Sequence, residues 1–153
     1  MAEWTVGPAG PEHERGLVYM WLEGAKQTRA AKAAGAARTY WRSHVPVVEY
    51  LLRSPATETR VVSDPEVPDS ILAFACTSGP ALHWVTVKRS AVRAGFGPEL
   101  LREVLPESML EGPTPCTFEQ LRLSDGSGQT VWRPPASWYV DPAWFARHFL
   151  EAA

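Results

Sequence analysis

One segment, from Leu82 to Leu105, combines residue types that could hold a phosphate group. It reads as a strand, a stretch with the cations Lys88, Arg89 and Arg93, the turn Gly95–Gly97, and a helix. Glycines at a turn into a helix let the backbone approach a diphosphate, and the helix N-terminus favours its charge. The segment therefore predicts a diphosphate site, although a tight turn with close helix packing explains the two glycines equally well.

The context of this turn excludes two common phosphate-binding motifs. A dinucleotide-binding fold needs a third glycine, a parallel βαβ unit and a later acid, and a P-loop needs Gly-Lys-Ser/Thr. Neither pattern is present in the segment. Three short apolar runs joined by turns precede the glycines instead, at residues 60–63, 71–76 and 82–87, and they indicate an antiparallel meander.

A meander followed by a glycine turn and a helix resembles the GNAT N-acetyltransferase superfamily, in particular compact GNAT-like proteins of bacterial and phage genomes. The resemblance covers residues 60–105 and, more loosely, two N-terminal helices. In the family the loop reads Gln/Arg-x-x-Gly-x-Gly/Ala and starts five residues after an apolar strand. Here Val87 ends the strand, Gly95 and Gly97 take the small positions, and Val92 replaces the Gln or Arg.

The resemblance implies an α/β fold of the α+β type, with a mixed, mainly antiparallel sheet flanked by helices in a single domain over residues 1–153. It also implies acetyl-CoA as cosubstrate and no metal. The pantetheine arm would bind backbone groups of Val85 and Val87. The pyrophosphate would bind beside the cations Lys88, Arg89 and Arg93, and the backbone N–H groups of Arg93, Ala94, Gly95, Phe96 and Gly97 would line it.

Acyl transfer to an amine needs a base for the amine proton and often an acid for the departing thiolate. Because side chains alternate along a strand, Ala81, His83, Val85 and Val87 should share a face, and His83 is the candidate base. A histidine satisfied at the edge of the core is the structural alternative. Tyr139, the late tyrosine, is the candidate acid, with packing as its alternative role.

The function implied by the resemblance is acetyl transfer from acetyl-CoA to a primary amine, by direct attack in a ternary complex. Two alternatives stay open. One is a catalytically decayed acyl-CoA-binding protein on the same scaffold. The other is a protein or nucleic-acid interaction module that uses the stretch 26–42, which has five cations and no acid, although a solvated helix face explains that stretch as well. The acceptor, and the choice between monomer and homodimer, are left open.

The elements that must position these residues follow from apolar spacing and turn residues. Further strands are expected at 116–118 and, as closing strands, at 131–132 and 137–140, and residues 64–69 should form a long hairpin loop. Helices are expected over 12–24, 40–52 and 98–105, and from Asp141 onward.

Composition is that of an ordinary globular domain: 153 residues, 45% apolar, 21% charged and a formal charge of -2. These values exclude a disordered tail and a nucleic-acid-coating protein. No apolar run approaches the roughly 20 residues that span a bilayer, and the first residues lack a secretory pattern, so we expect a cytoplasmic protein without a membrane partner. Cys76 and Cys116 lie in apolar segments and should be reduced, buried thiols.

Overall fold

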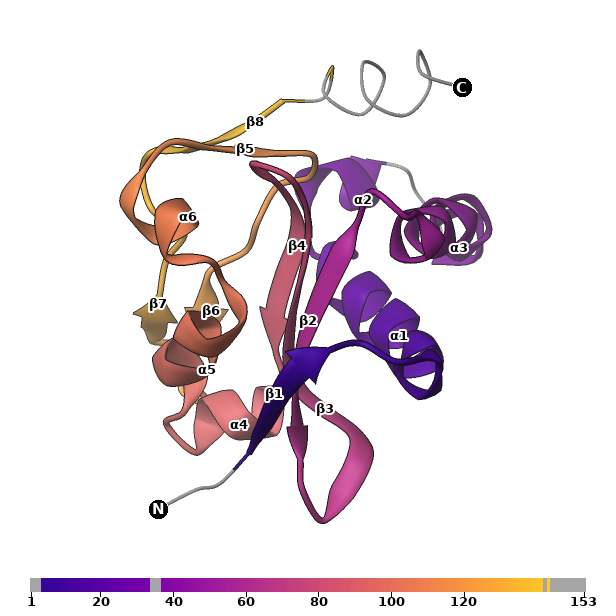
Figure 1. The fold of residues 1–153 in the computed structure, drawn as a ribbon. Coiled ribbons are helices and arrows are strands. Elements are labelled where there is room, and N and C mark those ends of the chain that lie inside the picture. Colours follow the sequence, from indigo (N-terminus) through magenta and orange to yellow (C-terminus); the bar gives the residue numbers. More distant parts are fainter. Residues whose placement is uncertain (1–3, 34–36, 142, 144–153) are drawn as a thin grey trace.

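A six-stranded sheet forms the centre of the computed structural model, which describes residues 4–33, 37–141 and 143 (Figure 1). The strand order is β1-β2-β3-β4-β5-β8; the first four strands are antiparallel neighbours, whereas β5 and β8 run parallel to β4. The predicted fold class, a mixed and mainly antiparallel sheet with flanking helices, is confirmed. The strands are β1 Thr5–Pro8, β2 Glu58–Asp64, β3 Val67–Ser78, β4 Ala81–Val87, β5 Thr114–Cys116 and β8 Trp138–Val140.

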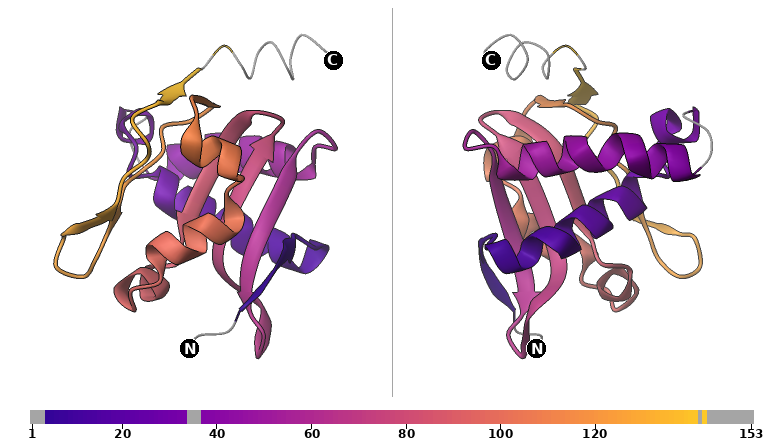
Figure 2. Two further views of the ribbon diagram at one scale, coloured as in Figure 1. Left: turned by 60° about the vertical axis from the view of Figure 1, so that its left-hand side comes forward. Right: turned by 90° about the vertical axis from the view of Figure 1, so that its right-hand side faces the viewer.

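Helices cover both faces of this sheet (Figure 2). α1 and α3 lie on one face, and α4, α5 and α6 lie on the other. Each long helix presents an apolar stripe at helical spacing, such as Leu17, Trp21 and Leu22 in α1, and this stripe is buried against the strands. The helices are η1 Pro11–His13, α1 Glu14–Ala25, α2 Arg29–Ala33, α3 Ala37–Arg53, α4 Arg89–Arg93, α5 Gly97–Val104 and α6 Glu107–Glu111.

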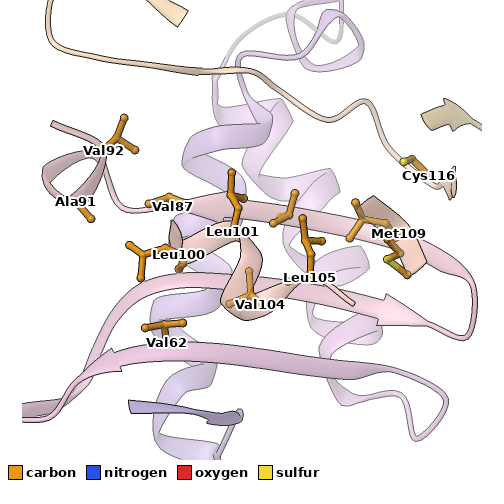
Figure 3. Packing of buried hydrophobic residues seen from close by; sticks show 14 residues of the cluster. Val62, Val87, Ala91, Val92, Leu100, Leu101, Val104, Leu105, Met109 and Cys116 are labelled. Atoms are coloured by element: carbon orange, nitrogen blue, oxygen red, sulfur yellow. The ribbon is translucent and has the colours of Figure 1, made fainter. Parts of the chain in front are cut away.

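Alternating residues of the central strands feed two hydrophobic cores, because successive side chains of a strand point to opposite faces. The first core lies under α1 and α3 (Figure 2). The second core lies under α4, α5 and α6, and Figure 3 shows its buried side chains. The first core includes Leu17, Trp21, Leu22, Val48, Leu51, Val61, Phe74, Cys76, Ala81 and Trp84. The second core includes Val62, Ala73, Ala75, Leu82, Val85, Val87, Val92, Leu100, Leu101, Val104 and Cys116.

Several predicted elements differ from the structure. The loop expected over 64–69 is a tight turn, since β2 extends to Asp64 and β3 begins at Val67, and the Asp64 carboxylate accepts the amide of Glu66. The strand expected over 116–118 ends at Cys116. Residues 131–132 do not close the main sheet; β7 Thr130–Trp132 pairs with β6 Leu123–Ser124 in a separate hairpin.

Two further expectations concern the stretch after β4 and the helix expected from Asp141. The stretch after β4 was expected to be a basic loop, but it forms the short helix α4 because Ala91 and Val92 bury their side chains in the second core. The helix expected from Asp141 lies outside the described residues. No helix in the described ranges is long and apolar enough to cross a membrane.

Candidate functional site

The candidate site begins on β4, where a β-bulge interrupts the pairing with β3. Cys76 pairs with Trp84 and Thr77 pairs with Leu82, so His83 is an extra residue without a partner position on β3. The bulge reverses the alternation of side chains: Ala81 belongs to the first core, whereas Val85 and Val87 belong to the second. The expectation that Ala81 and the two valines share one face was therefore wrong.

His83 is enclosed by hydroxyl groups. Its Nε2 lies 2.7 Å from Ser78 Oγ, and its Nδ1 lies 2.7 Å from Thr117 Oγ1. The side chain is fully buried, and desolvation lowers the pKa of His83 to about 4. The ring is thus neutral at pH 7, with one nitrogen donating and the other accepting. These surroundings favour a structural role, and the role of base stays a prediction.

Three cations gather just beyond the end of β4. Lys88 is the residue before α4, and Arg89 and Arg93 lie four residues apart on that helix, which places them on the same face. All three side chains are exposed, and no acid in the described part of the chain pairs with them. We call this cluster the cationic corner. Its charge is available to a phosphate group.

The end of α4 explains the glycine at position 95. Gly95 has φ +91° and its amide donates to Val92 O at 3.0 Å, while the Phe96 amide donates to Ala91 O at 3.0 Å. This pair of bonds is a Schellman cap, which requires a left-handed residue and thus favours glycine. The Ala94 amide also donates within α4. Three of the amides predicted to line a pyrophosphate therefore have intramolecular acceptors in this conformation.

Gly97 lies at the first position of α5, beneath the β6–β7 hairpin. A Cβ atom at this position would lie 3.5 Å from Leu123 Cδ1 and 4.0 Å from Val131 Cγ2. The same hairpin passes the cationic corner, because a Cβ on Gly126 would lie 3.8 Å from Arg93 Nε. In the described residues the Gly97 amide has no hydrogen-bond acceptor. Gly97 is buried, whereas the three cations are exposed, so the cations are more accessible to an anion than this amide is.

The outer edge of β4 has little strand pairing. β5 pairs with β4 only at Leu82↔Cys116, among the described residues, and β4 continues to Val87. The segment 117–120, which we call the strap, covers part of this edge. The Thr117 amide donates to Leu82 O at 3.0 Å, and Gln120 Oε1 accepts the Val85 amide at 3.1 Å. The predicted pantetheine contact at Val85 is thus occupied by a side chain of the same molecule.

Tyr139 lies two strands away from His83. It belongs to β8, opposite Pro115 of β5, and is 52% exposed. With neighbouring strands ~4.8 Å apart, the backbones of β4 and β8 are separated by about 10 Å across β5.

Cys116 of β5 is buried, and desolvation raises the pKa of its thiol to about 11, so it stays a neutral thiol. Both cysteines are free and buried, as expected.

Two of the five cations in the basic stretch 26–42, Lys26 and Arg29, lie beside acids. Lys26 Nζ lies 2.7 Å from a carboxylate oxygen of Glu23, and the Arg29 amide donates to Glu119 Oε1 at 3.3 Å. These acids come from outside the stretch and offset part of its charge. This arrangement favours the solvated helix face over a nucleic-acid contact.

A groove in the described part of the molecule lies away from the predicted residues. It has a volume of about 950 Å³ and lies between the start of β2, α1, α3 and the end of α5. It is lined by both acids and bases, including Glu14, Arg53, Arg60 and Arg102. Arg53 Nε donates to Glu14 Oε1 at 2.6 Å, so this cation of the groove already has an acid partner. The volume of this groove is therefore not sufficient to identify it as the binding site.

No protein-family model matches the sequence, and no curated protein matches it. Solved structures with a similar fold include YjaB of Escherichia coli in its apo form, a protein of Pyrococcus furiosus assigned as an acetyltransferase, and one of Desulfovibrio desulfuricans assigned to the GNAT acetyltransferases. Their identities to this chain are 17%, 18% and 18%, and their TM-scores are 0.47, 0.49 and 0.40. In the same order, the matched region covers 65%, 65% and 66% of this chain. It covers 63%, 70% and 62% of the chains in those structures, so this chain spans less than two-thirds of the length of the first and the third.

Sequence reasoning missed the strap. Its residues carry no motif, and their importance depends on contacts with β4 that are 34 to 37 residues away in sequence. One local signal was available: Pro113 and Pro115 limit a strand near Cys116, so the polar residues that follow could have been expected to leave the sheet.

Proposed function

We propose that this protein is a GNAT-type acyltransferase that moves an acetyl group from acetyl-CoA to a primary amine within a ternary complex. The observation that supports this most is the position of the cationic corner at the end of an incompletely paired strand. Phosphates would bind near Lys88, Arg89, Arg93 and the Gly97 amide, and an extended arm would follow the outer edge of β4.

The electrostatics of the corner suit a diphosphate. Three exposed cations without acid partners stand beside the first turn of α5, whose dipole also favours negative charge. A cation near a phosphate forms charge-assisted hydrogen bonds, which are about twice as strong as neutral ones. The run Arg93 to Gly97 remains our proposal for the pyrophosphate, with the condition that the Ala94, Gly95 and Phe96 amides must leave their α4 acceptors to take part.

The reaction requires no redox partner. The amine nitrogen attacks the thioester carbonyl carbon, a C–N bond forms, and the C–S bond breaks as the tetrahedral intermediate collapses. One proton leaves the amine and the departing thiolate gains one. His83 and Tyr139 are the proposed base and acid, and backbone N–H groups of β4 would stabilise the oxyanion.

Calorimetry with acetyl-CoA tests the site. Wild-type protein should bind acetyl-CoA, and Gly95→Trp should abolish binding because the indole would fill the corner. Gly79→Trp is the matched control, since Gly79 also has a positive φ and no atom within 4 Å of the position that a Cβ would take, but it lies in the turn before β4. Absence of binding by wild type, or equal loss in both variants, would contradict the proposal.

A second candidate is an acyl-CoA-binding protein that has lost catalysis. The burial of Val92 in the second core, at the family's Gln or Arg position, favours it, as does the enclosure of His83. The two candidates differ in turnover. A panel of amines, polyamines, aminoglycosides and peptides, assayed for thiol release from acetyl-CoA, should show activity for an enzyme and none for the binding protein.

A further inference from the structure

The side chain of Gln120 pairs with β4 as if it were one residue of a neighbouring strand. Gln120 Nε2 donates to His83 O at 2.9 Å, and Gln120 Oε1 accepts the Val85 amide at 3.1 Å. In a parallel sheet, one residue bonds in this way to the residues on either side of its partner. The Gln120 amide therefore takes the place of a strand residue opposite Trp84.

The strap holds Gln120 in this position. Thr117 is bonded to both Leu82 O and the His83 ring, and Glu119 accepts the amide of Arg29 at the start of α2. Gln120 Nε2 also donates to Phe118 O at 2.9 Å, which is a third hydrogen bond of this carboxamide. The carboxamide is nevertheless at the end of a flexible side chain that is only half-buried, so it can rotate away without unfolding the strap.

We infer that Gln120 is an internal competitor for the outer edge of β4. Its carboxamide closes this edge in the free protein and must rotate away when an extended ligand with secondary amides binds there. The inference rests on the proposed function, in which that ligand is the pantetheine arm of CoA. It adds a residue that lowers the affinity for the arm, because the Gln120 bonds to β4 must break before the arm can take their place.

Binding of CoA to wild type, Gln120→Ala and Gln129→Ala tests this inference. Gln129 is an exposed residue of the β6–β7 loop and serves as the control. Removal of the competing carboxamide should lower the Kd of Gln120→Ala for CoA by about tenfold, since two hydrogen bonds no longer oppose binding. Gln129→Ala should bind as wild type does. Adenosine 3′,5′-bisphosphate has phosphates but no amide, and its Kd should be equal for all three proteins.

The outcomes separate this inference from the proposed function. Equal CoA binding by wild type and Gln120→Ala, or weaker binding by the variant, would overturn the inference and leave the proposed function intact. No CoA binding by any protein would overturn both. A gain that also occurs for adenosine 3′,5′-bisphosphate would overturn the inference, because the effect would not concern the amide-bearing arm.

Amide hydrogen exchange provides a second measurement that needs no ligand. The Val85 amide should be protected in wild type and exchange faster in Gln120→Ala, while amides of β2 should be unchanged. Gln120→Met preserves the length of the side chain and is the second variant if alanine unfolds the strap. Unchanged protection of Val85 in both variants would overturn the inference.

Discussion

At the start of β4 a histidine is sealed between two hydroxyl groups, whereas just beyond the end of the same strand three cations face solvent. Both regions contain residue types that could do chemistry. His83 is fully buried and bonded on both ring nitrogens, and Lys88, Arg89 and Arg93 are exposed without acid partners in the described chain. Residue type thus marks candidates, and access to solvent decides which of them a ligand can reach in this conformation.

The largest expected effect comes from removal of the buried imidazole. His83→Ala should lower the free energy of unfolding by about 4 kcal/mol, since it leaves a cavity and removes the ring to which the Ser78 and Thr117 hydroxyls are bonded. Urea denaturation measures this loss. The control Arg93→Ala removes an exposed side chain and should change stability by less than about 0.5 kcal/mol. Equal effects of the two substitutions would break the comparison between the two regions.

The pH dependence of stability should contain a component from His83. The pKa of His83 is about 4 in the folded protein and 6.5 as its ordinary value, so the unfolded chain binds more protons between these pH values. Stability from this group is fully present above pH 6.5 and falls as the pH drops toward 4, by about 3 kcal/mol. Denaturation of His83→Gln over the same range should lack this component. An identical pH profile for the variant would contradict the assignment.

Charge reversal in the cationic corner tests whether these exposed cations bind acetyl-CoA. Arg89→Glu or Arg93→Glu should each raise the Kd for acetyl-CoA by about tenfold, because a cation near the diphosphate becomes an anion. Their thermal stability should be close to that of wild type. Arg15→Glu, on the exposed face of α1, is the control and should bind normally. Normal binding by both corner variants would remove the corner from the site.

The smallest effect concerns the cap of α4. Gly95→Ala should destabilise the protein by about 1 kcal/mol, because a Cβ is disfavoured at φ +91° even though no atom lies within 4 Å of it. Gly7→Ala, in β1 and equally uncrowded, has no positive φ and should be neutral. Denaturation of both variants checks the difference. If Gly95→Ala were as stable as Gly7→Ala, the Schellman cap would not explain Gly95.

The sequence by itself determined the elements whose signal is local. α1, α3 and α5 were predicted from apolar spacing, and the meander of β2, β3 and β4 from β-branched runs between turns, because periodicity reflects which side of an element is buried. The position of Gly95 and Gly97 at the entry to a helix was also predicted. These features need only a few neighbouring residues to be specified.

Only the tertiary structure decided what the candidate residues can reach. A core contact of Ala91 and Val92 turned the expected basic loop into α4, and a bulge at His83 placed Ala81 on the opposite face from Val85 and Val87. The strap contributes Gln120 from 35 residues further along the chain. Such contacts join segments that are distant in sequence, so burial and hydrogen-bond partners there depend on packing and not on local spacing.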